Sequence, residues 1–99
     1  MSSLTSKQRA YLRSLVHDLK PVLQVGAEGV SEGFLASLDE AFNTREVLKV
    51  RVLEGSDLTA REAADAIARE RPEVEVVQTI GRVVGLYRPF PEEPEIQLP

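Results

Sequence analysis

Apolar residues recur along this chain with two different periods, which separate its helices from its strands. In residues 5–20 and 31–44 the apolar positions are spaced by three and four residues, so they share one helix face and are expected to pack on the core. The two stripes consist of Leu12, Leu15, Val16 and Leu19, and of Phe34, Leu35, Leu38, Ala41 and Phe42. A third, alanine-rich helix is predicted after Thr59.

Polar residues and prolines mark where these helices begin and end. The segments Thr5-Ser6-Lys7-Gln8 and Thr59-Ala60-Arg61-Glu62 have the form of a capping box, in which the third helical side chain reaches back to the cap amide. Ser31 is the expected N-cap of the second helix. Because Pro21 disfavours helical backbone at the residue before it, the first helix is predicted to extend to Lys20.

The remaining apolar segments have the composition or the period of β-strands. Residues 46–53 alternate between apolar and charged side chains, as in a strand with one exposed face. Its two faces consist of Leu48, Val50 and Val52, and of Lys49 and Arg51. The other predicted strands cover residues 22–25, 74–80 and 83–88, and the last two are joined by a hairpin turn at Gly81-Arg82.

The resulting order, α-β-α-β-α-β-β, predicts an α/β (α+β sandwich) fold with a four-stranded mixed sheet covered by helices. Helices between successive strands favour parallel neighbours, whereas the final hairpin must be antiparallel. The chain of 99 residues is long enough for one domain, which we assign to residues 1–90. Residues 91–99 are rich in proline and glutamate and are predicted to form an irregular tail, whose packing the composition leaves open.

Composition narrows the class of protein. Hydrophobic residues make up 42% and charged residues 28% of the chain, which is typical of a folded domain rather than a disordered segment. The absence of cysteine excludes disulfides and cysteine-based metal sites. No segment has the apolar length of a membrane span, and no secretion signal is recognised. We therefore expect a cytoplasmic monomer with no membrane partner.

Charge is distributed unevenly along the chain. The net charge is −4, but residues 1–26 carry four basic residues and one acidic residue, a balance of +3, which leaves −7 for residues 27–99. In a helix that extends to Lys20, the side chains of Arg9, Arg13 and Lys20 lie within about 40° of one another and about 90° from the apolar stripe. This basic ridge is either a phosphate-binding surface or an ordinary solvated helix face.

The segment Gly26-Ala27-Glu28-Gly29, here called the glycine loop, lies between a predicted strand and a predicted helix. Two glycines three residues apart permit positive φ angles and leave the backbone amides accessible. The helix that follows begins with free N–H groups and the positive end of its dipole, which favour an anion. Such a loop clamps single-stranded RNA in some RNA-binding modules, but it is also a common strand–helix turn.

The sequence contains no group of residues that suggests a catalytic site. His17 is the only histidine, and without cysteine there is no Cys–His pair. The adjacent carboxylates Asp39-Glu40 diverge on a helix, and Glu92-Glu93 lie in the tail. We therefore expect a non-enzymatic protein with no catalytic residues, no metal site and no cofactor.

Several motifs follow one another in a family-specific order. They are Lys7-Gln8-Arg9, Leu19-Lys20-Pro21, the glycine loop, Leu48-Lys49-Val50-Arg51-Val52, and Ile80-Gly81-Arg82 followed by Leu86-Tyr87-Arg88. In this order they resemble the YhbY-type RNA-binding proteins, the stand-alone bacterial form of the CRM domain (chloroplast RNA splicing and ribosome maturation). The resemblance covers residues 4–90.

The resemblance implies a fold like the C-terminal domain of translation initiation factor 3. It also implies association with rRNA of the precursor large ribosomal subunit and a role in ribosome assembly; ribosomal proteins are expected as partners if the protein acts as an adaptor. The RNA-binding residues that it implies are Gly26, Ala27, Glu28 and Gly29 of the glycine loop, and Arg9, Arg13 and Lys20, with Lys49, Arg82 and Arg88 as extensions.

Glu28 departs from the family pattern, in which small polar or basic residues stand between the two glycines. A carboxylate at this position repels a phosphate, unless its side chain points to solvent while the backbone amides bind. It also interacts favourably with the N-terminus of its own helix. The alternative function is therefore a ribosome-associated adaptor that binds protein partners through its acidic surface.

Overall fold

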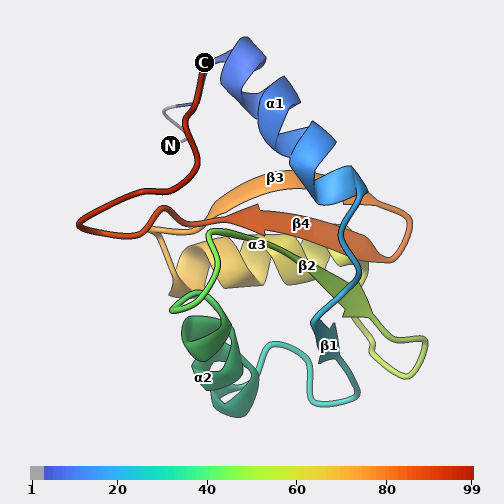
Figure 1. Cartoon of the computed structure of the whole chain (residues 1–99). Helices are drawn as coiled ribbons and strands as arrows, with labels where there is room; N and C mark the ends of the chain where they lie inside the picture. Colours follow the sequence, from blue (N-terminus) through green and yellow to red (C-terminus); the bar gives the residue numbers. More distant parts are fainter. Residues whose placement is uncertain (1–3) are drawn as a thin grey trace.

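The computed structural model describes residues 4–99 and has the predicted order of elements; residues 1–3, at the start of the predicted domain, lie outside the described part. Its strands form one sheet in the order β1-β2-β4-β3 (Figure 1). β1 (Leu23–Val25) runs parallel to β2 (Val47–Val52), and β4 (Val83–Tyr87) runs antiparallel to both β2 and β3 (Glu75–Ile80). The predicted four-stranded mixed sheet is therefore confirmed.

Three helices pack on the sheet, and their N-terminal caps are those that the sequence predicts. α1 (Ser6–His17) and α3 (Ala60–Glu70) begin with complete capping boxes at Thr5 and Thr59. α2 (Glu32–Ala41) begins after Ser31, whose hydroxyl oxygen accepts a hydrogen bond from the amide of the third helical residue. These bonds satisfy N–H groups that the first turn of a helix leaves without a partner.

The first helix is shorter than predicted. α1 ends at His17 and does not reach Lys20. The intervening residues instead turn the chain towards the sheet, where the amide of Val22 donates to the carbonyl oxygen of Lys49 at 3.0 Å. Leu19, which the helical spacing assigned to the apolar stripe, is 37% exposed as a result. The prediction failed because entry into a strand parallel to β2 requires the chain to leave the helix earlier.

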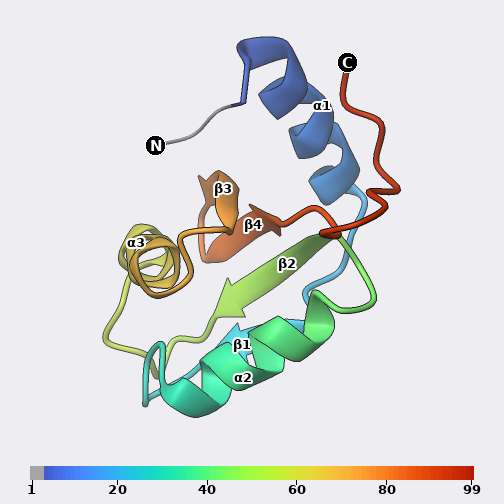
Figure 2. The same ribbon diagram turned by 90° about the vertical axis from the view of Figure 1, so that its left-hand side faces the viewer.

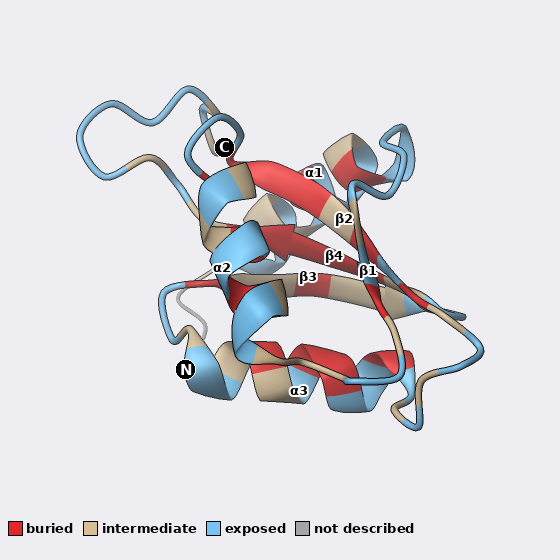
Figure 3. Cartoon of the chain, turned by 90° about the horizontal axis from the view of Figure 1, so that it is seen from below, coloured by how far each residue is buried: buried red, intermediate tan, exposed pale blue. Residues whose placement is uncertain are grey.

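Helices cover both faces of the sheet, with α1 on one face and α2 and α3 on the other (Figure 2). The larger core, between the sheet and α2 and α3, includes Val25, Leu38, Phe42, Leu48, Val50, Ile67 and Leu86. A smaller cluster beneath α1 consists of Leu12, Val16, Val47, Val77 and Tyr87. Figure 3 shows the buried residues of β2 and β4 between these layers. The face of β2 that was predicted to be exposed is thus partly covered by α1.

The C-terminal tail contains no helix or strand, yet it is packed against the domain. The carboxylate of Glu46, a buried residue, accepts hydrogen bonds from the backbone amides of Phe90 at 2.7 Å, Glu95 at 2.9 Å and Ile96 at 2.7 Å. Ile96 and Leu98 then pack against the apolar cluster beneath α1. In Figure 2 the tail passes beside α1. Glu46 therefore holds both ends of residues 91–94, which form a projecting loop, while the residues after them pack on the domain.

Candidate nucleic-acid interface

The basic ridge predicted on the first helix is not one continuous row. Arg13 is exposed on α1, but Lys20 lies beyond the end of the helix, so the 100° spacing used to align the two does not apply. The Nη1 of Arg9 donates to the carbonyl oxygen of Val76 on β3 at 2.7 Å, which ties α1 to the edge of the sheet. Arg9 therefore differs from the two exposed cations in that its guanidinium group binds the backbone of β3.

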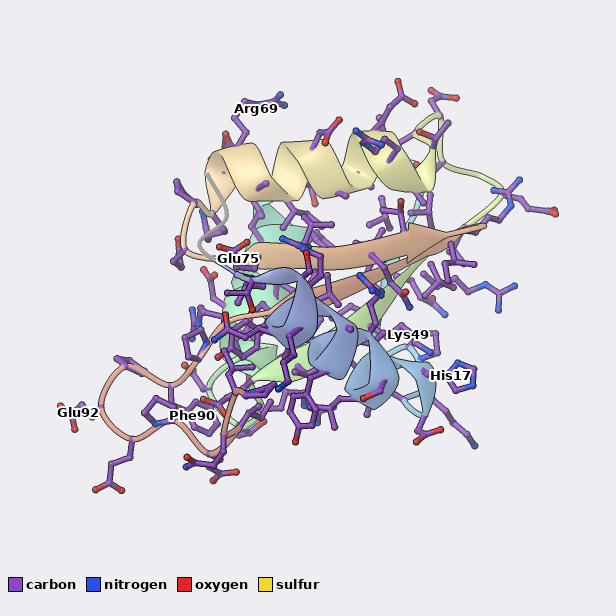
Figure 4. All side chains as sticks on the ribbon, turned by 90° about the horizontal axis from the view of Figure 1, so that it is seen from above. His17, Lys49, Arg69, Glu75, Phe90 and Glu92 are labelled. Atoms are coloured by element: carbon purple, nitrogen blue, oxygen red, sulfur yellow. The ribbon has the colours of Figure 1, made fainter. Side chains whose placement is uncertain are left out.

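Lys49 joins the C-terminal end of α1 to the sheet. Its Nζ donates to the carbonyl oxygens of Leu19 at 2.8 Å and His17 at 3.4 Å. A cation at this position compensates the negative end of the helix dipole. Figure 4 shows Lys49 and His17 together at this end of α1. Any RNA contact by Lys49 would share its ammonium group with the helix end.

The glycine loop makes a tight turn between β1 and α2. The amide of Gly29 donates to the carbonyl oxygen of Gly26 at 3.0 Å, and Gly29 has a φ of 69°. Because L side chains rarely adopt this angle, the fold itself requires glycine at residue 29. A Cβ on Gly26 would meet only Leu53 Cδ1, at 4.0 Å. Ala27 and Glu28, between the glycines, are exposed.

A hollow of about 350 Å³ lies between the glycine loop and the first turns of α2. The Ser31 hydroxyl, on its rim, already accepts the amide hydrogen of Phe34 at 3.1 Å. One of the free N–H groups of α2 is therefore occupied by the cap, and Glu32 places a carboxylate in the same turn. Phosphate binding by this loop remains a prediction. The occupied N–H group and the nearby carboxylate make the site less favourable for an anion than the free helix terminus that the sequence indicated.

Beside the glycine loop, the predicted Arg82 lies with three polar residues that the prediction did not include, Gln24, Arg51 and Glu54. Gln24 of β1 and Arg51 of β2 are register partners, and the amide of Val52 donates to the carbonyl oxygen of Arg82 at 2.7 Å. These contacts bring the β3–β4 hairpin next to the ends of β1 and β2. Gln24, Arg51, Glu54 and Arg82 line a hollow of about 520 Å³, here called the corner hollow. The alternation in β2 placed Arg51 beside Lys49, but the pairing with β1 is not visible in the sequence.

Arg88 does not join the other predicted RNA-binding residues. It follows β4 at the end opposite Arg82, so the two are about 20 Å apart along an extended strand. The guanidinium carbon of Arg88 lies 5.1 Å from the centroid of the Phe42 ring, a cation–π contact. Its amide donates to the carbonyl oxygen of Glu46 at 2.8 Å. Arg88 therefore packs on α2, away from the glycine loop.

Cations predominate on α1 and the adjoining sheet, whereas carboxylates predominate on α2, α3 and the tail. Apart from Arg9, which binds Val76, the exposed or half-exposed cations of α1, of the segment after it and of the adjoining sheet are Lys7, Arg13, Lys20, Lys49, Arg51 and Arg82. The exposed carboxylates of α2, α3 and the tail include Glu32, Glu40, Glu62, Asp65, Glu70, Glu92 and Glu93. In Figure 4, α3 and the tail loop with Glu92 extend away from α1. Such segregation gives an acidic protein one positive face, here called the basic face, which attracts polyanions.

An ion pair on the acidic side joins α2 to the end of α3. The Nε and Nη2 of Arg71 donate to Oδ1 and Oδ2 of Asp39 at 2.8 and 2.9 Å. These hydrogen bonds lower the pKa of Asp39 below its usual 3.8 and raise the pKa of Arg71. Because each charge is compensated by the other, the pair adds nothing to the basic face.

His17, the one histidine of the chain, is exposed on the last turn of α1. In the part of the chain that the structure describes, no three histidine, aspartate or glutamate side chains are grouped so that they could hold a metal ion. Among residues 4–99, no helix has both the length and the apolar composition needed to cross a membrane.

Comparison with known proteins gives consistent matches over nearly the whole chain. The model of the CRS1 / YhbY (CRM) domain matches residues 4–88. An "RNA-binding protein" of Haemophilus influenzae is 42% identical over 99 residues, which cover 100% of this chain and 98% of that protein. The "Probable RNA-binding protein YqeI" of Bacillus subtilis is 38% identical, over 97% of this chain and 99% of the relative. The solution structure of the hypothetical protein SAV1595 from Staphylococcus aureus has a TM-score of 0.79 and 38% identity, over 97% of this chain and 99% of that one.

Proposed function

The chain belongs to the CRS1/YhbY (CRM) domain family, and from this premise we propose that it is a non-enzymatic RNA-binding protein. We propose further that it acts in the cytoplasm, associates with rRNA of the precursor large ribosomal subunit, and assists ribosome assembly. The observation that supports the proposal is the basic face, which lies beside the glycine loop on an otherwise acidic protein. The relatives that match this chain over nearly their full length are named as RNA-binding proteins, which supports the proposal.

In the proposed mechanism the cations neutralise phosphates and the glycine loop fixes the register of the RNA backbone. Arg13 and Lys20 carry the first role, because their exposed side chains make no hydrogen bond or ion pair within residues 4–99. Arg9 is assigned to positioning instead, because it already binds the carbonyl oxygen of Val76. The accessible backbone around Gly26 carries the second role.

The test is filter retention of large-subunit rRNA across a salt series, with an unrelated RNA of equal length beside it. Arg13→Glu with Lys20→Glu should weaken retention strongly, and should reduce the slope of log K against log salt by about 1 to 2 if two phosphate contacts are lost. The matched control is Arg61→Glu with Arg69→Glu, which makes the same charge change on α3. Equal loss in both double variants would show that net charge, and not the basic face, determines binding.

The finer assignment to ribosome assembly requires a measurement in cells. The tagged protein should retain precursor large-subunit rRNA in excess over mature rRNA after purification at moderate salt. The Arg13→Glu, Lys20→Glu variant should lose this RNA while it stays folded. Retention of ribosomal proteins after nuclease treatment, without rRNA binding by the purified chain, would instead support the adaptor function.

A further inference from the structure

We infer that the corner hollow binds one unpaired guanine base of the RNA, so that the protein reads sequence as well as backbone. The inference rests on the proposed RNA-binding function and deepens it, because it assigns a base to residues other than Arg13 and Lys20, which carry the proposed phosphate contacts. The residues that carry it are Gln24, Arg51, Glu54 and Arg82, which line the hollow.

Four side chains form a continuous row across the end of the sheet. Gln24 pairs in register with Arg51, Arg51 with Val83, and Val83 with Ile80. Residues in register point to the same face of a sheet, so the row lies on the face that α1 covers elsewhere. The next row towards α1 contains Gly85, which lies directly under Val16. The Gln24–Ile80 row is therefore the first one beyond the helix.

This row is accessible, and its polar members have no partner among residues 4–99. Gln24 and Arg51 are exposed, and Ile80 is 64% exposed although it is a large apolar residue. Within residues 4–99, no ion pair or hydrogen bond engages the side chains of Gln24, Arg51, Glu54 or Arg82. Two arginines and a glutamate thus line one hollow without pairing with one another, which leaves their hydrogen-bonding groups available to a ligand.

The frame around the hollow is held by backbone bonds. The amide of Leu53 donates to the carbonyl oxygen of Val25 at 2.9 Å, and the amide of Val52 donates to that of Arg82 at 2.7 Å. These two bonds join the ends of β1 and β2 to the β3–β4 hairpin. The side chains around the hollow therefore project from a fixed support, as base recognition requires.

The carboxylate of Glu54 is the feature of the hollow that favours a base over a phosphate, since the two arginines alone would attract either. Glu54 would repel a phosphate in the hollow, whereas its carboxylate oxygens can accept hydrogen bonds from the N–H groups of a base. The arginines offer only donors, which suit base acceptors. The apolar surface of Val83 and Ile80, at the other end of the row, suits the face of a neighbouring base. Sequence-specific RNA recognition uses unpaired bases in this way.

Guanine is the base whose pattern fits this set of groups. It presents adjacent N1–H and N2–H₂ donors to a carboxylate such as that of Glu54, and the O6 and N7 acceptors to an arginine. Adenine and cytosine have an amino donor next to an acceptor nitrogen, which a carboxylate would repel. Uracil offers one N–H group between two carbonyl acceptors. The Gln24 amide, which donates and accepts, can complete the contacts to guanine.

The experiment measures binding of 12-nucleotide uridine RNAs that carry guanosine, inosine, adenosine or uridine at the centre, by fluorescence anisotropy at one salt concentration. The guanosine RNA should bind roughly 5- to 150-fold more tightly than the adenosine RNA, the ratio expected for one good bidentate contact. Inosine, which lacks the 2-amino group, should lose part of this preference. The Glu54→Ala variant should bind guanosine and inosine RNAs equally, whereas the control Glu92→Ala should keep the wild-type preference.

The outcomes separate this inference from the function on which it rests. Base recognition would be overturned if all four RNAs bound with equal affinity. Loss of that binding in the Arg13→Glu, Lys20→Glu variant would leave backbone binding intact as the function. An unchanged guanosine preference in Glu54→Ala would overturn the assignment to the corner hollow. Failure of every RNA to bind, including large-subunit rRNA, would overturn the proposed function together with the inference.

Discussion

Gly85 of β4 lies directly under Val16 of α1: a Cβ on this glycine would be 2.7 Å from Val16 Cγ1 and 3.1 Å from Cγ2. Real Cβ atoms do not approach other carbon atoms so closely, so the helix rests on bare backbone at this point. Leu12 and Val16, both fully buried, then fill the space between α1 and the sheet. The absence of one side chain in β4 therefore sets how close α1 sits to the sheet.

The Gly85→Ala substitution should destabilise the protein by about 1 to 3 kcal/mol, the usual cost of an extra methyl group in a packed interface. In a Val16→Ala background the same substitution should cost at least about 1 kcal/mol less, because the opposing methyl groups are gone. Chemical denaturation of the four proteins measures this coupling. Additive effects of the two substitutions would contradict the contact.

The tail should depend on one carboxylate. Glu46→Ala leaves three backbone N–H groups of the tail without their charged acceptor, and should lower the free energy of unfolding by about 2 to 4 kcal/mol. Hydrogen exchange should show loss of protection at the amides of Phe90, Glu95 and Ile96. Glu92→Ala, in the same loop, is the control and should change neither quantity. Retained protection of those amides in the Glu46 variant would show that apolar packing alone holds the tail.

Tyr87 should ionise at unusually high pH. Burial, and secondarily the charge of Glu46, raises the pKa of its phenol above the ordinary value of 10.0. Tyr11→Phe leaves Tyr87 as the remaining tyrosine, so absorbance at alkaline pH reports it alone. Since the folded pKa is the higher one, the stability gained from neutral Tyr87 is complete below pH 10 and falls as the pH rises through the folded pKa. A midpoint at or below 10 would contradict the burial.

The Asp39–Arg71 pair should stabilise the protein at neutral pH and lose its effect in acid. The pKa of Asp39 is lowered in the folded state, so its contribution is complete above 3.8 and disappears as the pH falls through the folded pKa. Both side chains are partly exposed, so solvent screening keeps the coupling between them small. A double-mutant cycle with Asp39→Asn and Arg71→Met, measured at pH 7 and in acid, tests this. A coupling that stays constant as the pH falls into the acid range would contradict it.

Gly26→Ala tests backbone clamping by the glycine loop more directly than Gly29→Ala does. Gly26 has space for a methyl group and no positive φ, so the variant should fold with unchanged stability. If RNA approaches the backbone there, the methyl group should weaken binding several-fold, whereas Glu28→Ala should leave binding equal or tighter because a repulsive carboxylate is removed. Gly29→Ala would be less informative, because its φ of 69° strains the fold itself. Unchanged RNA affinity in Gly26→Ala would count against clamping.

The helices and strands and their order follow from local patterns in the amino-acid sequence. The capping boxes at Thr5 and Thr59, the cap at Ser31 and the period-two pattern of residues 47–52 are local features, and each forms where it was predicted. Helices between strands then restrict the sheet topology to few alternatives, which is why the mixed sheet could be inferred. Local hydrogen bonds and side-chain spacing require no knowledge of distant residues.

The tertiary structure decided which side chains are brought together. The row from Gln24 through Arg51 to Ile80 depends on the register between strands that are far apart in the sequence. The same holds for Lys49, which binds the end of α1, and for Arg9, which binds β3, so the charges of both are shared with backbone carbonyl groups that neither the strand pattern nor the helical spacing placed beside them. Glu46 looks like an ordinary charged residue in the sequence, yet it anchors the tail. Such contacts follow from the packing of whole elements, because long side chains reach groups that no local pattern places beside them.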